Sequence, residues 1–305
     1  MSLPNKVQII EVGPRDGLQN EKQTLSVDLR VELIERLAKS GLKKIEAGSF
    51  VSPKWVPQMA GTDEVLDKLN ANTALKDEGV QYAVLTPNLK GLEGAIQHQA
   101  DEVAIFGAAS ESFTQKNINC TIKESLKRFE AVVAQAQQIN LPVRGYVSTI
   151  IGCPYEGDIQ PEAVADVAKT LYEMGCYEIS LGDTIGVGTP KKFQHMLETV
   201  MREIPVDKLA VHCHNTYGQA LANIYASLEL GINKIDSAIA GLGGCPYAKG
   251  ASGNIATEDV IFMLNGLNIE TGIKLDGSDG LIETSHWICK QLGRDNQSKV
   301  ALALK

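Results

Sequence analysis

Short apolar runs alternate along the chain with longer segments in which apolar residues recur every three to four positions. The short runs are rich in Val, Ile and Leu and indicate buried strands, whereas the longer period indicates amphipathic helices. Eight strands are expected before residue 240, near Val7–Val12, Lys43–Ala47, Val80–Leu85, Glu102–Phe106, Val143–Thr149, Tyr177–Leu181, Leu209–Cys213 and Lys234–Ile239. The strand–helix order predicts parallel strands joined by right-handed crossovers.

Several helix ends can be placed from single residues. Ser26 can cap a helix whose Ile34, Leu37 and Ala38 lie on one face. Pro161 stands where the first residue of another helix belongs. Three further helices are expected to end in a glycine placed four residues before a strand Ile; the pairs are Gly41 and Ile45, Gly175 and Ile179, and Gly231 and Ile235.

The number of strand–helix units predicts the architecture. Eight units within 240 residues fit a closed (β/α)8 barrel, which typically has about 250 residues. An open doubly wound sheet is the rival fold, but the first strand is followed by the sequence GPRDG and not by a dinucleotide-binding glycine pattern. We expect one catalytic domain over residues 1–305, with the barrel at about 5–255. Two C-terminal helices, near Thr257–Gly266 and Gly280–Leu292, would pack on it.

Composition narrows the class of protein. The net charge is −8 and Lys and Arg are scattered, which argues against a nucleic-acid surface. No apolar run approaches the roughly 20 residues of a membrane span. The first residues show no signal or transit pattern, and the six cysteines indicate reduced thiols. We therefore expect a cytoplasmic enzyme that gathers local positive charge if it binds an anionic substrate.

Reactive residues gather at the predicted carboxyl ends of the strands, where barrel enzymes place their active sites. They are Arg15 and Asp16 after the first strand, Glu46 in the second, Asp183 after the sixth, His212 and His214 at the seventh, and a glycine-rich run at 241–254 after the eighth. This clustering predicts an active site at that end of the barrel.

The sequence His212-Cys213-His214 is the sharpest local signal for a metal. Strand side chains alternate, so both imidazoles point to one face and can grip one ion; the alternative is a pair of hydrogen-bonded core histidines. Asp16 and Asn254 add oxygen ligands only if they converge on this pair, because alone they indicate a surface ion pair and a turn residue. A mixed oxygen and nitrogen set favours Mg²⁺ or Mn²⁺, and no Cys-x-x-Cys spacing supports structural zinc.

Cys245 is the thiol of greatest interest. It lies in the run 241–254, in which five of fourteen residues are glycine, and such a backbone can hinge over a site. One hypothesis is a proton donor or acceptor carried on a lid, and the other is an incidental loop cysteine.

The motifs together carry a family resemblance. They occupy residues 11–21 (EVGPRDGLQNE), 49–59 (SFVSPKWVPQM), 107–111 (GAASE), 152–157 (GCPYEG), 180–188 (SLGDTIGVG) and 241–254. This set resembles the hydroxymethylglutaryl-CoA lyases, within a wider family that includes isopropylmalate and homocitrate synthases and the carboxyltransferase domain of pyruvate carboxylase. The likeness covers the chain from about residue 7 to about residue 294.

The resemblance implies a role for individual residues. The implied metal ligands are Asp16, His212, His214 and Asn254; the implied catalytic residues are Arg15 and Cys245, with Glu46 and Asp183 in support; and Arg15 and Gln19 are implied to bind substrate. The family usually has Asp after the second histidine, where this chain has Asn215. That residue is expected beside the ligands and not among them.

The implied reaction cleaves 3-hydroxy-3-methylglutaryl-CoA to acetoacetate and acetyl-CoA, with a CoA thioester as partner and a homodimer as assembly. Asp183 or Glu46 could assist removal of the hydroxyl proton, and Lys22, Lys54 and Lys116 are candidate phosphate contacts. Two alternatives remain: a related acyl-CoA lyase or condensing synthase, and a barrel without enzymatic activity. The synthases generally carry Glu where this chain has Gly17, and a non-enzymatic barrel would lack such polar strand ends.

Overall fold

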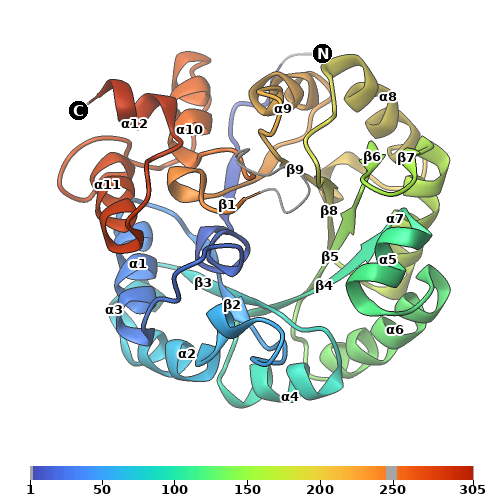
Figure 1. Cartoon of the computed structure of the whole chain (residues 1–305), viewed down its shortest axis with the longest axis horizontal. Coiled ribbons are helices and arrows are strands. Elements are labelled where there is room, and N and C mark those ends of the chain that lie inside the picture. The colour runs from blue at the N-terminus through green and yellow to red at the C-terminus, as the bar shows by residue number, and fades with distance from the viewer. Residues whose placement is uncertain (1–2, 245–252, 305) are drawn as a thin grey trace.

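A computed structural model describes residues 3–244 and 253–304 (Figure 1). Eight parallel strands close into one barrel in the order β1-β10-β9-β8-β5-β4-β3-β2. Their bounds are β1 Gln8–Glu11, β2 Lys44–Ser49, β3 Gln81–Leu85, β4 Glu102–Ala108, β5 Val143–Ser148, β8 Glu178–Asp183, β9 Leu209–Cys213 and β10 Lys234–Ser237. Each expected strand is one of these eight. The (β/α)8 barrel is therefore confirmed, and the open sheet is excluded.

Helices surround the barrel, as Figure 1 shows. They are α1 Val27–Lys39, α2 Thr62–Ala71, α3 Thr73–Asp77, α4 Leu89–Gln97, α5 Glu111–Ile118, α6 Ile122–Gln138, α7 Pro161–Met174, α8 Pro190–Val200, α9 Ala220–Glu229, α10 Thr257–Gly266, α11 Leu281–Leu292 and α12 Lys299–Ala303. In the described part of the chain, no helix combines the length and the apolar character that crossing a bilayer requires.

The predicted helix ends are confirmed. The Ser26 hydroxyl accepts a hydrogen bond from the Leu29 amide at the start of α1, and Pro161 opens α7. The three predicted glycines adopt left-handed backbone, with φ of 107° at Gly41, 116° at Gly175 and 90° at Gly231. Each therefore allows the chain to turn from a helix into a buried strand without a steric penalty.

Three features differ from the expectation. A hairpin of β6 (Gly152–Cys153) and β7 (Gly157–Asp158) follows β5. The eighth barrel strand ends at Ser237 because Ile239–Gly241 form a 3₁₀ turn. A third C-terminal helix, α12, follows α10 and α11. All three are short, and short elements leave little periodicity in a sequence.

Two layers of side chains are separated by the strands. In β5, Val143 and Val147 join the apolar core shared with the surrounding helices. Arg144 and Tyr146 alternate with them, and Arg144 reaches Asp236 on β10, which is not a neighbour of β5 in the barrel. The Arg144 side chain must therefore point into the barrel. An apolar layer outside and a polar interior follow from this alternation.

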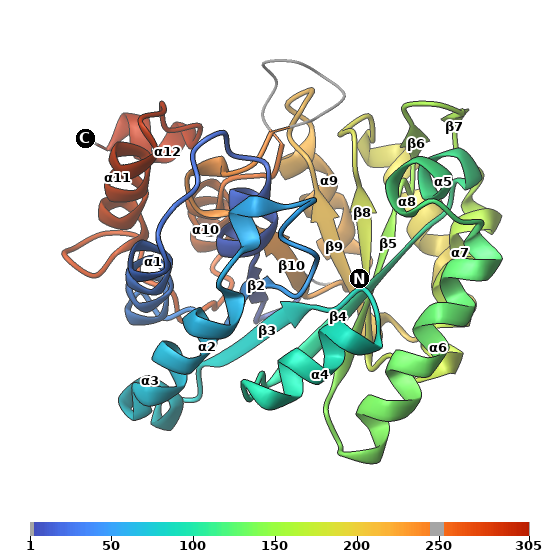
Figure 2. The ribbon, with the colours of Figure 1, turned by 60° about the horizontal axis from the view of Figure 1, so that its bottom comes forward.

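The C-terminal helices pack against the barrel's outer layer. Figure 1 shows α11 beside α1, and α10 and α12 on the same side of the molecule. Figure 2 turns the molecule so that the carboxyl ends of β5, β8 and β9 point upward. That end carries the cavity described next.

Candidate active site

A cavity of about 860 Å³ opens at the carboxyl ends of the strands. Arg15, Asp16, Gln19, His212 and His214 all contribute to its lining. This is the end at which (β/α)8 enzymes place their catalytic residues. Four of them, Arg15, Asp16, His212 and His214, belong to the cluster expected at the strand ends, and Gln19 is a residue that the resemblance implies for substrate binding.

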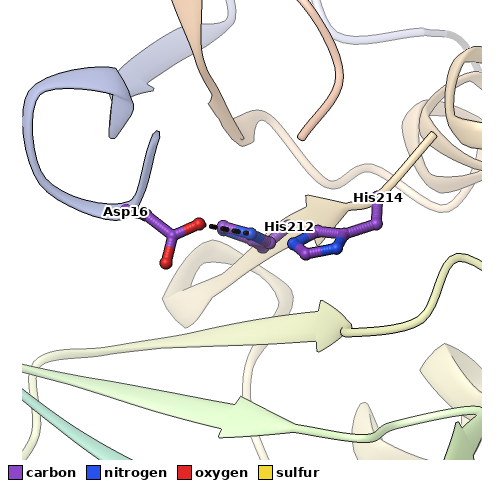
Figure 3. A group of neighbouring side chains, drawn as sticks. All are labelled: Asp16, His212 and His214. Atoms are coloured by element: carbon purple, nitrogen blue, oxygen red, sulfur yellow. Dashed lines mark ion pairs between the residues drawn. The ribbon is translucent and has the colours of Figure 1, made fainter. Parts of the chain in front are cut away.

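Asp16, His212 and His214 form one cluster in this cavity (Figure 3). One potential ligand atom from each residue lies within 4.8 Å of the others, and Asp16 Oδ2 is 3.9 Å from His212 Nε2. Among the described residues, the buried Nδ1 of His214 has no hydrogen-bond partner. A core histidine would be expected to satisfy that nitrogen. The donor set thus fits a divalent cation better than it fits a packed histidine pair.

Local structure explains how the three residues of this cluster meet. His212 lies in β9 and His214 directly follows that strand in extended backbone, so the two rings, two positions apart, project to the same face. Asp16 lies in a π-helical turn, Gly13–Gly17, directly after β1. A Cβ at Gly17 would lie 2.6 Å from that of Leu242, so only glycine lets this turn pack against the loop after β10.

Asn254 reaches the same cluster from the returning end of that loop. Its backbone pairs with His214 in an isolated antiparallel bridge. Its side-chain Nδ2 donates to Asp16 Oδ2 at 2.8 Å and to the Leu242 carbonyl at 3.2 Å. As a metal ligand, Asn254 would present its amide oxygen to the ion.

Arg15 is buried and fixed by two carboxylates. Its Nε donates to Glu46 Oε2 and its Nη1 to Asp16 Oδ1, both at 2.7 Å. Its guanidinium also lies 5.6 Å from the centre of the Tyr146 ring. Burial opposes the positive charge, but Glu46 and Asp16 outweigh it and raise the pKa of Arg15. The side chain is therefore a preorganised cation beside the candidate metal site.

The environment lowers the pKa of two residues of the cluster, Asp16 and His214. Burial acts against the charge of Asp16, but Arg15 and His212 outweigh it and lower the pKa of the Asp16 carboxyl to about 2. Burial lowers the pKa of His214 to about 4, assisted by the neighbouring His212. At neutral pH the cluster therefore offers a carboxylate and a neutral imidazole, which are the forms that bind a cation.

The structure gives Glu46 and Asp183 different surroundings. Glu46 contacts Arg15 through Oε2, while its Oε1 is buried without a partner and burial raises its pKa. Asp183 Oδ2 accepts from the Gly188 amide at 2.8 Å, and burial raises the pKa of that carboxyl to about 6. Neither residue lines the cavity, in which Asp16 is the one carboxylate among the described residues. The roles predicted for Glu46 and Asp183 remain predictions.

Other predicted residues fall into three groups. Lys116 lines the cavity, whereas Lys22 and Lys54 are exposed and are not part of its lining. Asn215 is directed to α9, where its Oδ1 accepts from the Ala220 amide at 3.3 Å. Cys245 lies outside the described residues. Its proposed role as a proton donor therefore rests on the sequence.

Sequence reasoning missed four polar residues of the barrel interior and mouth. Tyr146 and Arg128 line the cavity, while Arg144 and Asp236 form an ion pair inside the barrel. A charged residue in the middle of an apolar strand was the available signal for Arg144 and Asp236. No sequence pattern indicated that the two would meet.

Comparisons with known proteins agree with this geometry. A model of the HMGL-like family matches residues 6–283. The cytoplasmic 3-hydroxy-3-methylglutaryl-CoA lyase of Rattus norvegicus is 58% identical over 301 residues, which is 99% of this chain and 85% of that protein. The mitochondrial hydroxymethylglutaryl-CoA lyase of Homo sapiens is 58% identical over 302 residues, covering 99% of this chain and 90% of its own.

Solved structures give the same result. The hydroxymethylglutaryl-CoA lyase of Pseudomonas aeruginosa is similar with a TM-score of 0.95 and 56% identity, covering 100% of this chain and 99% of that one. An Acinetobacter baumannii HMG-CoA lyase in complex with coenzyme A and 3-methylmalate has a TM-score of 0.91 and 36% identity, covering 99% and 96%. The family model and the 58% identity over nearly the whole length show that the chain belongs to the HMGL-like family.

Proposed function

We propose that this protein is a divalent-metal-dependent lyase that cleaves 3-hydroxy-3-methylglutaryl-CoA to acetoacetate and acetyl-CoA. The observation that carries the proposal is the convergence of Asp16, His212, His214 and Arg15 in one cavity. The chain's 58% identity over 301 residues to a lyase named for this substrate supports the choice of substrate.

The reaction breaks the bond between C2 and C3 of the acyl group. The C3 hydroxyl loses its proton, its oxygen becomes the ketone of acetoacetate, and the bonding electron pair moves to C2 and the thioester oxygen as an enolate. Protonation at C2 then gives acetyl-CoA. A divalent cation held by Asp16, His212, His214 and Asn254 would lower the pKa of the hydroxyl.

Arg15 is assigned to the charge that develops on the thioester oxygen. Because Glu46 and Asp16 hold its guanidinium in place, no reorganisation is needed as the enolate forms. Gln19 is assigned to substrate binding, and its place in the cavity lining supports this role. Cys245 is assigned to protonation of C2, and Asp183 and Glu46 to supporting roles.

Mg²⁺ or Mn²⁺ is the proposed cofactor. Two imidazoles, a carboxylate and an amide oxygen form a mixed set that suits octahedral coordination, and a thiolate zinc site would need cysteines that this cluster lacks. We further propose one catalytic domain over residues 1–305, a homodimer and a cytoplasmic location. The five cysteines of the described residues are free and buried, which supports a reducing compartment.

The test is acetoacetate release from 3-hydroxy-3-methylglutaryl-CoA, followed with a coupled dehydrogenase in the presence of a thiol reductant. Activity should appear with Mg²⁺ or Mn²⁺ and vanish with a chelator. Cleavage of a different hydroxyacyl-CoA alone would assign a related lyase, and condensation of an α-keto acid with acetyl-CoA would assign a synthase. Sedimentation of the same preparation tests the dimer.

Cys245→Ser tests the proposed proton donor. The hydroxyl resembles the thiol in shape, but its pKa lies far above the ordinary thiol value of about 8.5. Turnover should nearly vanish while metal binding, measured by calorimetric titration, stays the same. Substantial residual turnover would show that the proton comes from another group.

A further inference from the structure

Asp236 lies on β10 inside the barrel, and its two carboxylate oxygens are fully used. Oδ1 accepts from Arg144 Nη2 at 2.7 Å. Oδ2 accepts from Arg144 Nη1 at 3.0 Å and from Ser180 Oγ at 2.7 Å, and it lies 3.3 Å from His212 Nδ1. Asp236 is buried, so water does not compete for these contacts.

This geometry dictates where His212 carries its proton. A guanidinium that binds both oxygens of a carboxyl group is the arrangement of an ionised pair. An ionised carboxylate only accepts hydrogen bonds, so His212 Nδ1 must be the donor in its contact with Asp236. In a neutral imidazole the other nitrogen, Nε2, then has a free lone pair. Nε2 is the atom that lies 3.9 Å from Asp16 Oδ2.

We propose that Asp236 is a positioning residue of the metal site, which holds His212 with its proton on Nδ1 and presents Nε2 to the cation. The proposal rests on the metal site of the proposed function. Histidine ligands in proteins commonly donate their second nitrogen to a carboxylate, which fixes both the tautomer and the ring orientation. His214 is held differently, because its buried Nδ1 has no partner in the part of the chain that the structure describes.

Arg144, on β5, holds Asp236 in place across the barrel interior. Its Nε donates to Glu178 Oε1 at 2.7 Å, so the guanidinium is anchored on β8 while it grips Asp236 on β10. Glu178 also pairs with Lys234 at 2.8 Å. Glu178 belongs to the same ionic network and has no contact with His212. It therefore provides a matched control.

The decisive variant is Asp236→Asn. Where its NH₂ group takes the place of Oδ2 it faces His212 Nδ1, and two donors cannot face each other, so the His212 proton should move to Nε2 and remove the lone pair that the metal needs. The affinity for Mn²⁺ in a calorimetric titration should fall about 10–100-fold. The same NH₂ group would also face Arg144 Nη1, so the amide can turn and leave its oxygen to His212. Asp236→Ala, which offers no acceptor in either orientation, is therefore measured beside it and should show the same loss. ¹⁵N NMR of the imidazoles in metal-free protein should show the change of tautomer.

Glu178→Gln separates positioning from stability. It removes a carboxylate charge from the same Arg144, so it should lower the free energy of unfolding while the Mn²⁺ affinity and the His212 tautomer stay as in the wild type. An equal loss of Mn²⁺ affinity in Glu178→Gln and Asp236→Ala would overturn the proposal. So would a wild-type His212 that carries its proton on Nε2.

The tautomer also distinguishes this proposal from the proposed function. If the wild type binds neither Mg²⁺ nor Mn²⁺, the metal site is wrong. An Nδ1 proton on wild-type His212 that shifts to Nε2 only in the Asp236 variants would still support the hold of Asp236 on that ring. If the wild type binds Mn²⁺ and Asp236→Ala binds it equally well, the positioning role alone is overturned.

Discussion

Carboxylates on the two sides of the barrel wall differ in the direction of their pKa shifts. On the inner side, facing the mouth and interior, we compare the partly buried Asp16 with the buried Glu178 and Asp236. On the outer side, between the strands and the surrounding segments, we compare the buried residues Glu11, Asp183 and Glu258. The pKa values of the inner carboxyls are lowered. Those of the outer carboxyls are raised, to about 7 for Glu11, 6 for Asp183 and 8 for Glu258.

The partners explain the difference. Burial acts against the charge of Asp236, but the Arg144 guanidinium outweighs it and holds the pKa well below its usual range. Burial also dominates at Glu11, which accepts only from Thr257 Oγ1 and from the Ile239 and Gly13 amides. Neutral donors do not offset the desolvation of a charge as a cation does. The presence of a facing cation, more than the degree of burial, decides the charge of these carboxyls.

Glu46 is an exception to this rule. Arg15 faces it and lowers its pKa, yet burial prevails and the net shift is upward. Its Oε1 has no partner among the described residues, so only half of the carboxylate is compensated. In Asp236, by contrast, both oxygens accept hydrogen bonds and the pKa is lowered.

The largest effect is expected from His214→Ala, which removes one of the proposed metal ligands. The loss of metal affinity should exceed the roughly 10–100-fold that an outer partner of a ligand contributes. Calorimetric titration measures it, and circular dichroism checks that the fold is retained. Cys213→Ala is the matched control, because Cys213 is buried in the outer core; it should cost stability and leave the metal affinity as it is. An unchanged dissociation constant for the metal in His214→Ala would support the alternative that His212 and His214 are hydrogen-bonded core histidines.

The second largest effect is expected from Arg15→Gln. Loss of a preorganised donor to the enolate should lower kcat by roughly 10²–10³, equivalent to about 3–4 kcal/mol. KM and metal affinity should change much less, because the partner charge exists mainly at the transition state. Arg15→Lys should rescue only partly, since a point charge cannot reproduce the planar fork that contacts Glu46 and Asp16. A Gln variant that keeps kcat and loses thermal stability would make Arg15 a structural ion pair.

Glu258→Gln tests the outer carboxyls through pH. Burial raises the pKa of Glu258 in the folded protein from the ordinary 4.5 to about 8. The stability that the protonated carboxyl contributes is therefore fully present below pH 4.5 and is lost as the pH rises through 8. Between pH 6 and pH 8 the free energy of unfolding of the wild type should fall by roughly 2 kcal/mol relative to the variant. Urea unfolding at several pH values measures this.

Glu178→Gln makes the same test on the inner side of the barrel wall, where the stability should change with pH in the opposite direction. The folded pKa of Glu178 is lowered, so its stabilising contribution is present above the ordinary pKa and is lost as pH falls. If the free energy of unfolding changes with pH in the same way in the wild type, Glu258→Gln and Glu178→Gln, the inner and outer carboxyls do not differ in charge.

The smallest effect is expected from Ile179→Val in the outer apolar layer. Ile179 is fully buried, and removal of one methylene should cost about 0.5–1.5 kcal/mol in the free energy of unfolding. kcat and metal affinity should stay at the wild-type level, because the side chain points away from the cavity. A shifted metal affinity would show that packing outside the barrel reaches the ligands within it.

The sequence by itself determined the barrel and the outline of its site. Strand and helix periods are local properties, so eight strands could be placed without knowledge of their partners. Ser26 and Pro161 marked helix starts for the same reason. The spacing of His212 and His214 put both rings on one face because strand geometry alone decides it.

Only the tertiary structure decided which polar groups meet. Gly182 lines the cavity, whereas the next residue, Asp183, does not line it and accepts from the Gly188 amide; its predicted supporting role remains a prediction. Arg144 and Asp236 are 92 residues apart, and their contact spans strands that are not neighbours. Such contacts depend on strand order, register and barrel closure, which arise from the whole chain and leave no local pattern in the sequence.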